Sequence, residues 1–284
     1  MKYDKIGIFD SGFGGLTLFK CIQKALPQFD YEYLGDNART PYGNRSFDTV
    51  LRFTTEGVEF LIDRGCRLVI IACNTASARA LRSIQQTWLL KRQQTDPGLR
   101  VLGVIRPTVE QMARLSASHS MAVWATPGTV KSDSFVLEAQ KYAPGTELIQ
   151  TPCPLLVPLI EAGELSGPGV EHYISKYWQE TLAQHQRSPS RKIDSLLLAC
   201  THYPLLLPAI RKVVPSDVKI ATQGEIVSAS LKDYLGRHSE MAAQLSQNGS
   251  TTYFTTDQCE YFDQLAQIFM GHTVTSQKAD LASP

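Results

Sequence analysis

Six short, continuous apolar runs are spaced along this 284-residue chain, and they constrain its fold more than any other feature. They occupy residues 6–9, 68–72, 101–105, 121–125, 196–199 and 218–221. Continuous apolar runs of this length are typical of strands that are buried on both faces of a parallel sheet. Helical patterns fill the intervals, at residues 47–64, 76–90 and 170–186. This alternation predicts an α/β fold with parallel-rich sheets flanked by helices.

Composition excludes several classes of protein. The chain is 43% hydrophobic, which is ample for a core, and its length suggests one or two domains. The formal net charge is +1, and no basic cluster suggests a nucleic-acid or anionic-membrane partner. The first ten residues have no signal-peptide pattern, and no apolar run reaches transmembrane length. We therefore expect a cytoplasmic protein.

Polar clusters follow four of the predicted strands. They are "DSGFGG" (10–15), "CNTAS" (73–77), "ATPGT" (125–129) and "CTHYP" (200–204). In open α/β sheets, ligands bind beyond the carboxyl ends of the strands, so these clusters indicate a binding site. "DSGFGG" lacks both the G-x-G-x-x-G pattern and the Walker lysine, so its glycines predict a tight turn rather than a nucleotide site. Asp10 is a candidate to hold a ligand ammonium or a proton.

The chain has six cysteines: Cys21, Cys66, Cys73, Cys153, Cys200 and Cys259. None forms a C-x-x-C pair, and a reducing cytosol disfavours disulfides. For Cys21, Cys66 and Cys259 a role as small buried hydrophobes is favoured. Cys73 and Cys200 are each followed by residues with hydrogen-bonding side chains, which places the two thiols at the boundary between the core and a cleft. For these two cysteines the pattern favours a catalytic role and a structural role about equally.

Several chemistries could use Cys73 and Cys200. Cys200 and His202 could be two metal ligands, but no further ligands can be named. A cysteine protease needs only one such thiol, and a redox pair needs two sulfurs within bonding range. Two acid/base groups on opposite faces of a tetrahedral carbon would invert it, and a thiol pKa can be lowered towards the working pH that such catalysis needs. Because the two roles swap with reaction direction, this chemistry best explains two similar settings.

The motifs together resemble one family. "DSGFGG", "PYG" (41–43), "CNTAS", "ATPGTV", the glutamate of "PLIEAG" and "CTHYP" occur in the order found in glutamate racemases of the aspartate/glutamate racemase superfamily. The resemblance covers nearly the whole chain. It implies an isomerase that interconverts L- and D-glutamate without a cofactor or a metal. It also implies a bacterial role in supplying D-glutamate for peptidoglycan synthesis.

The resemblance also implies roles for particular residues. Cys73 and Cys200 would be the acid/base thiols, with Asp10 assisting the first and His202 the second. Glu161 would position the histidine or the substrate ammonium. The substrate-binding residues would be Asp10, Ser11, Pro41, Tyr42, Gly43, Asn74, Thr75, Thr126, Thr129, Thr201 and His202.

The residue types fit a substrate with two carboxylates. Helix N-terminal amides and the hydroxyls of serine and threonine are natural carboxylate receptors. The alternative for the threonines is helix capping: Thr75 and Thr201 would serve both roles, whereas Thr126 and Thr129 could be caps alone.

The resemblance further implies two similar domains with the active site in the cleft between them. The first domain would comprise residues 1–98 and 209–271, and the second residues 99–208, with a flexible tail at 272–284. Family members often dimerise, which makes a homodimer a candidate assembly. At residues 222–223 the chain has Thr-Gln where many members have Asp-Ser, so no direct role is predicted there.

Two rival functions remain open at this stage. One is an aspartate racemase or another member of the superfamily. The other is a small-molecule binding or regulatory protein that keeps the fold without turnover. The presence of both thiols and both assisting groups favours the enzyme.

Overall fold

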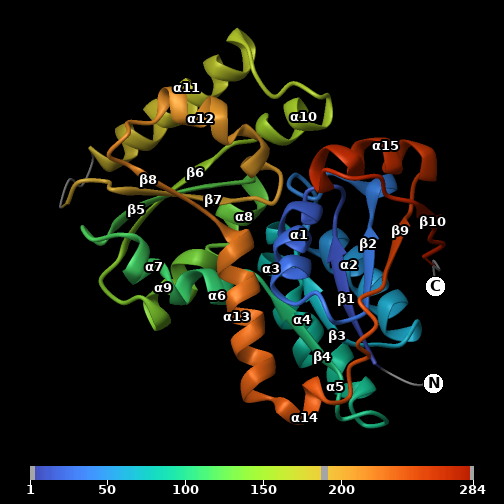
Figure 1. The fold of residues 1–284 in the computed structure, drawn as a ribbon. Helices are drawn as coiled ribbons and strands as arrows, with labels where there is room; N and C mark the ends of the chain where they lie inside the picture. Colours follow the sequence, from blue (N-terminus) through green and yellow to red (C-terminus); the bar gives the residue numbers. More distant parts are fainter. Residues whose placement is uncertain (1–3, 187–190, 282–284) are drawn as a thin grey trace. The chain divides into compact units, whose positions relative to one another are not determined.

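The computed structural model describes residues 4–186 and 191–281, and the chain forms two compact units (Figure 1). The first unit comprises Met1–Val104 and Gly224–Pro284, and the second comprises Ile105–Gln223. The chain thus leaves the first unit after Val104 and returns to it at Gly224.

The first unit is built on a six-stranded sheet in the order β10-β9-β2-β1-β3-β4, in which every neighbouring pair is parallel. Its strands are β1 (Lys5–Asp10), β2 (Tyr31–Gly35), β3 (Cys66–Ile71), β4 (Arg100–Gly103), β9 (Thr251–Thr255) and β10 (Ser276–Lys278). Its helices are α1 (Gly15–Ala25), η1 (Asn37–Arg39), α2 (Phe47–Asp63), α3 (Asn74–Arg79), α4 (Leu81–Gln86), α5 (Trp88–Arg92), α13 (Gln223–Arg237), α14 (Ser239–Ala242) and α15 (Cys259–Met270).

One core cluster of the first unit lies between the sheet and helices α2, α3 and α4. Phe9 of β1, Ile71 of β3 and Leu61 of α2 are fully buried in it. Each such side chain contributes about 1.5–3 kcal/mol by leaving water. The α2 helix begins after Ser46, whose hydroxyl accepts a hydrogen bond from Thr49 N at 3.2 Å and caps it.

The second unit has a four-stranded parallel sheet in the order β6-β5-β7-β8. Its strands are β5 (Ser120–Ala125), β6 (Glu147–Pro152), β7 (Ser195–Ala199) and β8 (Lys219–Thr222). Its helices are α6 (Ile105–Glu110), α7 (Met112–Leu115), α8 (Pro127–Lys131), α9 (Ser134–Tyr142), α10 (Leu156–Glu161), α11 (Pro168–His185), η2 (Tyr203–Leu206) and α12 (Leu207–Val213). Trp124 of β5 is fully buried and donates its indole N–H to Thr181 Oγ1 of α11 at 3.0 Å.

The two sheets share one topology. The second sheet, β6-β5-β7-β8, repeats the order β2-β1-β3-β4 found in the first. Strand β1 therefore corresponds to β5, and β3 corresponds to β7. In this order the direction of chain progression reverses between β1 and β3, and again between β5 and β7. The loops after those strands flank the crevice where ligands of such sheets bind.

The predicted fold class is confirmed, and each of the six apolar runs overlaps a strand. The helix predicted at 76–90 is wrong in detail, because the segment forms three short helices, α3, α4 and α5. One break falls at Thr87, whose backbone leaves the helical region. Its hydroxyl donates to the Ser83 carbonyl at 2.7 Å, a local bond that competes with helix continuation.

The domain boundaries differ from those expected. Strand β4 pairs with β3, so residues 99–104 belong to the first unit, and β8 pairs with β7, so residues 209–223 belong to the second. The flexible tail predicted at 272–284 is wrong for the described part. There β10 pairs with β9, and Ala279 is buried. Residues 282–284 lie outside the described residues. The domain boundaries and the structure of the C-terminal segment thus depend on pairing between strands that are distant in sequence.

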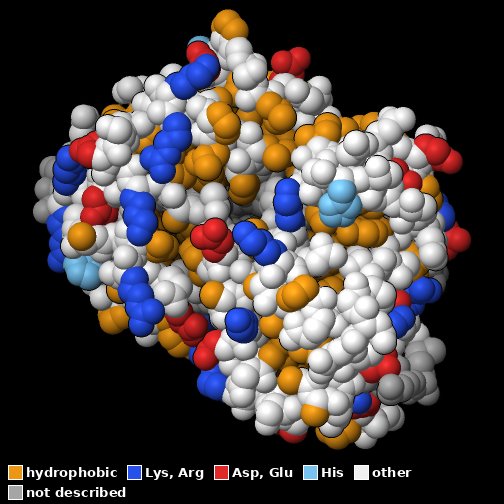
Figure 2. All heavy atoms as spheres, viewed as in Figure 1, with side chains coloured by type: hydrophobic (Ala, Val, Ile, Leu, Met, Phe, Trp, Pro, Cys, Tyr) orange, Lys and Arg blue, Asp and Glu red, His pale blue; other side chains and the backbone are white. Residues whose placement is uncertain are grey.

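The surface carries mixed charge. On the face drawn in Figure 2, Lys and Arg side chains are dispersed among acidic and hydrophobic ones, in keeping with the formal net charge of +1. Within residues 4–186 and 191–281, none of the helices combines the length and apolarity needed to cross a bilayer.

Candidate active site

The first candidate residues lie in the loop after β1. Asp10 ends the strand and is fully buried, and its Oδ2 accepts a hydrogen bond from Gly12 N at 3.0 Å. A Cβ at Gly15 would lie 2.5 Å from Asp10 Cβ, so only glycine can begin α1 against this carboxylate. The predicted tight turn is thus tied to the placement of Asp10.

The second loop, after β3, carries Cys73. This residue caps α3, and its sulfur accepts a hydrogen bond from Ala76 N at 3.5 Å. Ser11, from the loop after β1, donates its hydroxyl to the same sulfur at 3.2 Å. A donor aimed at a sulfur stabilises the negative charge that the sulfur carries once it has lost its proton. The two loops at the β1/β3 reversal therefore meet at the Cys73 thiol.

Neighbouring residues of this loop are also buried. Asn74 and Thr75 are the first residues of α3. Because Cys73 is the cap, the capping role predicted for Thr75 is wrong. The burial of both polar side chains at the end of the strand remains compatible with substrate binding.

The "PYG" segment lies between η1 and α2 and begins with a cis Thr40–Pro41 peptide bond. Pro41 is exposed, Gly43 is partly buried, and the Tyr42 side chain is buried in the same core cluster as Cys73. The Tyr42 hydroxyl donates to Asp36 Oδ2. The tyrosine side chain is thus packed in the core, and a substrate-binding role predicted for this segment would fall to its backbone.

The second unit carries a corresponding site after β7. His202 Nδ1 lies 4.0 Å from Cys200 Sγ, and His202 Nε2 lies 3.2 Å from Glu161 Oε1 at the end of α10. Cys200, Thr201 and His202 are all buried. Histidine thus links the thiol to a carboxylate from a separate helix, an arrangement that orients the ring and stabilises its protonated form.

The charge state of His202 follows from these neighbours. Burial lowers its pKa, but hydrogen bonds and negative charge from Cys200 and Glu161 outweigh burial and raise the pKa from 6.5 to about 10. The ring is therefore an imidazolium at neutral pH. This places a positive charge beside the Cys200 sulfur.

Thr126 and Thr129 lie in the loop after β5, the strand that corresponds to β1. Thr126 caps α8 by accepting from Thr129 N at 3.3 Å, as expected of a cap, and the two hydroxyls lie 3.1 Å apart. They are buried at the carboxyl edge of the same sheet as Cys200. Capping does not exhaust a hydroxyl, which has a donor and two acceptor lone pairs.

Of the remaining cysteines, Cys66 and Cys153 are buried, whereas Cys21 and Cys259 are only partly buried, so the prediction of a buried hydrophobe is confirmed for Cys66 and wrong for Cys21 and Cys259. Burial raises the pKa of the Cys66 thiol and of the Cys153 thiol well above 9.0, as expected for inert thiols. Cys153 follows β6, and its carbonyl accepts a hydrogen bond from Tyr203 at 3.0 Å, beside the Cys200 loop. Among residues 4–186 and 191–281, no three or more His, Cys, Asp and Glu side chains gather in a way that could hold a metal ion.

No family model matches the chain, but curated relatives match nearly all of it. The glutamate racemase of Geobacter metallireducens is 36% identical over 271 residues, covering 95% of this chain and 94% of that one. The glutamate racemase of Paracoccus denitrificans is 38% identical over 286 residues, covering 96% and 99%. The chain belongs to the glutamate racemase family. It is thereby an amino-acid racemase, an isomerase, as the motif resemblance implied.

Solved glutamate racemase structures share the fold. The enzyme of Francisella tularensis, solved in complex with D-glutamate, has a TM-score of 0.82 and 31% identity and covers 99% of both chains. Four of the glutamate racemase motifs of the present chain lie at the carboxyl ends of strands β1, β3, β5 and β7, at the two corresponding reversals of sheet order.

Sequence reasoning missed one group beside these motifs. Asp36 follows β2, is fully buried and receives the Tyr42 hydroxyl. Its signal in the sequence was a carboxylate directly after the apolar end of a strand, the same placement that singled out Asp10.

Proposed function

We propose that the chain interconverts L- and D-glutamate by a two-base proton transfer between Cys73 and Cys200. One cysteine, as thiolate, takes the α-proton, and the electron pair of the C–H bond stays on the substrate as a carbanion. The other cysteine, as thiol, then gives a proton to the opposite face. After one turnover the two sulfurs have exchanged protonation states, so the reverse reaction uses the same groups.

The equivalence of the two thiols is the observation that carries this proposal. Cys73 follows β3 and Cys200 follows β7, the corresponding strand of the second sheet. Each thiol is 6% exposed, which leaves it sheltered but within reach of a ligand at the strand ends. A single-nucleophile mechanism gives no reason for such a match, whereas a two-base mechanism, in which the two groups exchange roles with reaction direction, explains it.

Each thiol has its own assisting groups in this proposal. Ser11 donates to the Cys73 sulfur, and Asp10 ends the adjacent strand, where it can exchange a proton or hold the substrate ammonium. His202, held by Glu161, supports the charge of Cys200. The mechanism needs no cofactor, because both proton-transfer groups belong to the chain.

The polar residues around the thiols are proposed to bind the substrate. Hydroxyl, amide and backbone donors can share the two carboxylates of glutamate. The proposed set is Ser11, Asn74, Thr75, Thr126, Thr129, Thr201 and the backbone of Pro41, Tyr42 and Gly43.

The biological setting is also a proposal and rests on the family resemblance. The D-glutamate would be made in the cytoplasm and used for bacterial peptidoglycan. We propose a homodimer as the assembly, because members of the family often dimerise.

The direct test follows deuterium at Cα during racemisation in D₂O. Starting from L-glutamate, we expect the D-product to carry deuterium from the first turnovers, while the remaining L-substrate stays unlabelled, because different thiols serve the two faces. The enzyme should keep this activity after dialysis against a chelator and treatment with a carbonyl reagent. Equal early labelling of substrate and product would contradict the two-base mechanism, and turnover restored only by metal or pyridoxal phosphate would contradict cofactor independence.

We expect glutamate to exceed aspartate by about 10²-fold or more in kcat/KM. One methylene alone is worth about 10- to 200-fold, and a shorter substrate leaves buried donors unpaired. His202 also avoids the fixed negative charge that an acidic residue would place beside a substrate carboxylate. Circular dichroism of each amino acid measures the rates. Equal turnover of both substrates would move the assignment to the broader superfamily.

The threonine hydroxyls of the second unit can be tested in the same assay. Thr126→Val removes a hydroxyl proposed to receive the distal carboxylate, whereas Thr126→Ser keeps it and keeps the α8 cap. The valine variant should lose more activity on glutamate than on aspartate, and the serine variant should match the wild type. Equal loss on both substrates would assign Thr126 to capping alone.

A further inference from the structure

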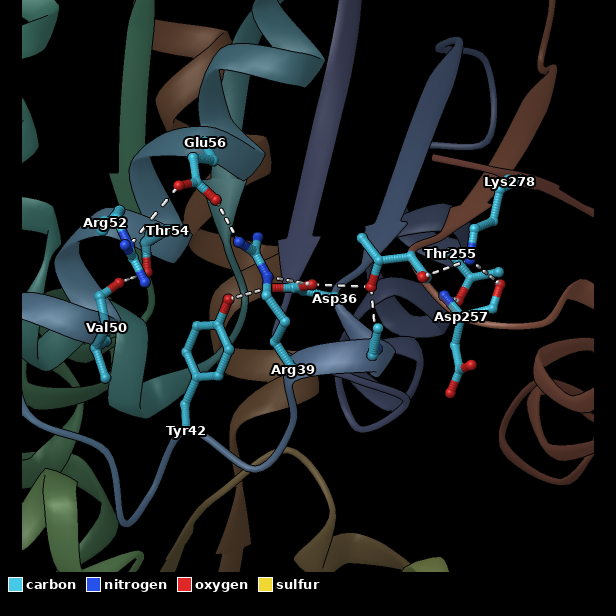
Figure 3. A network of polar contacts seen from close by, with 12 residues as sticks. Asp36, Arg39, Tyr42, Val50, Arg52, Thr54, Glu56, Thr255, Asp257 and Lys278 are labelled. Carbon is cyan, nitrogen blue, oxygen red and sulfur yellow. Dashed lines mark hydrogen bonds and ion pairs between the residues drawn. The ribbon is translucent and has the colours of Figure 1, made fainter. Parts of the chain in front are cut away.

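The turn after β2 is organised by a buried carboxylate. Asp36 is 0% exposed and accepts hydrogen bonds from the Tyr42 hydroxyl, from Arg39 Nε at 2.8 Å and from Thr256 Oγ1 at 2.8 Å (Figure 3). Burial raises its pKa, while these donors and the charge of Arg39 oppose the rise. A buried carboxylate is costly unless it is paired, so this group specifies the positions of its three donors.

Arg39 extends the network to α2. Its Nη1 pairs with Glu56 of that helix (Figure 3). Its guanidinium lies 4.0 Å from the centroid of the Phe53 ring. A guanidinium held by two carboxylates and stacked on a ring has little freedom. The turn that contains η1 is therefore fixed at both ends, to β2 and to α2.

Tyr42 connects this network of contacts to the "PYG" segment. Its ring packs against Phe9 and Phe53, with centroids 6.4 and 5.8 Å away, and its hydroxyl is held by Asp36. The phenol is thus an internal anchor for Pro41–Gly43. The backbone of the segment keeps its place only while that anchor holds.

The same turn contacts the loop of Asp10. Asp36 N donates to the Asp10 carbonyl at 3.0 Å. A Cβ at Gly12 would lie 3.3 Å from Thr40 Oγ1, which shows how closely the two loops approach. A displacement of the turn would therefore also disturb the end of β1.

We propose that Asp36 is a positioning residue of the racemase, which fixes the backbone of Pro41–Gly43 through Tyr42 and Arg39 without touching the substrate. This inference rests on the proposed function of the segment in substrate binding. If the ordered segment is only a fraction of the population, apparent substrate affinity falls by that fraction. Turnover of bound substrate changes little, because binding restores the same arrangement.

Asp30 provides a matched control in the same unit. It is 5% exposed and also accepts several hydrogen bonds, among them those from Asn248 Nδ2 at 2.6 Å, Ser250 N at 2.8 Å and Ser250 Oγ at 2.7 Å. It precedes β2, whereas Asp36 follows it, so the two carboxylates lie at opposite ends of one strand. Asp30→Asn thus removes a similar buried charge at the edge away from the candidate site.

The test compares Asp36→Asn, Tyr42→Phe and Asp30→Asn with the wild type. For Asp36→Asn we expect KM for glutamate to rise about tenfold or more, with kcat within about threefold. Amide hydrogen exchange in the peptide covering residues 37–46 should accelerate about tenfold. Asp30→Asn should lose stability but keep the wild-type KM and the wild-type exchange of that peptide. Tyr42→Phe should act in the same direction, and the double variant should be no worse than Asp36→Asn.

Several results would overturn the inference. These are an unchanged KM and unchanged exchange in Asp36→Asn, or an equal rise of KM in Asp30→Asn. If Asp36→Asn does not fold, Tyr42→Phe alone decides by the same readouts. If the wild type does not racemise glutamate, the proposed function fails, yet hydrogen exchange still decides whether Asp36 orders the segment.

Discussion

Replacing either Cys73 or Cys200 with serine is expected to lower glutamate racemisation by about 10³-fold or more in both directions. Serine matches cysteine in shape, but its hydroxyl is a far weaker acid than a thiol and cannot serve as the base near neutral pH. Both directions should suffer because, in the proposed mechanism, every turnover uses one sulfur as base and the other as acid.

The structure gives a reason to expect folded variants. Cys73 caps α3 through its sulfur, and serine is a stronger helix cap than cysteine, so Cys73→Ser should not weaken that helix. Cys259→Ser is the control, because this thiol is partly exposed at the start of α15 and is not among the candidate site residues. It should retain wild-type activity.

Isotope exchange sharpens the thiol prediction. A variant with one thiol can still remove and return the proton of one enantiomer. By family resemblance Cys200 serves L-glutamate and Cys73 serves D-glutamate, so each variant should exchange the α-hydrogen of one enantiomer only. Nuclear magnetic resonance of substrate in D₂O measures this exchange. Racemisation at near the wild-type rate in either variant would reject the two-thiol mechanism.

Strands buried on both faces were predictable because burial forces a continuous apolar run. Strand β2 was not, because its sequence, "YEYLG", places Glu32 among apolar residues. Glu32 is 1% exposed and is held by Lys5 at 2.7 Å and Arg64 at 2.9 Å. Partners distant in sequence make that burial tolerable, and a local pattern does not reveal them.

The candidate site, like the strands, was predictable from the sequence only in part. The strand-end rule placed Cys73, Cys200 and Asp10 from sequence alone, because it depends on local pattern and topology. The contact between Glu161 and His202 joins residues 41 positions apart, and it depends on where α10 ends relative to β7. The family resemblance identified Glu161 and His202 as site residues, and the structure shows that the two side chains contact each other.

The proposed role of His202, to support the charge of Cys200, leads to the second large expected effect. Replacing it with asparagine should lower kcat/KM by about 10²-fold or more, because asparagine donates hydrogen bonds but carries no charge to support Cys200. His172→Asn is the control, since His172 is exposed on α11. Activity within about threefold of the wild type in His202→Asn would remove this residue from the mechanism.

The charge itself can be observed by nuclear magnetic resonance of ¹⁵N-labelled histidine. With a pKa of about 10, the His202 ring should stay protonated at pH 8, where an exposed histidine is neutral. Glu161→Gln keeps a hydrogen-bonding group but removes its charge, so the ring of that variant should lose its proton at lower pH. A neutral His202 ring at pH 7 in the wild type would contradict the ion-pair arrangement.

The free energy of unfolding should depend on pH through the proton that His202 binds. The folded pKa of His202 lies above its unfolded value of 6.5, so its contribution is complete below pH 6.5 and is lost as pH rises to about 10. The slope of this loss approaches about 1.4 kcal/mol per pH unit in the free energy of unfolding. Glu161→Gln should begin from a smaller contribution, because its folded pKa is lower. The difference between wild type and variant should therefore be constant near pH 6–7 and close by about pH 10. Urea unfolding at each pH measures it, and a difference that grows with pH would show that Glu161 acts on some other group.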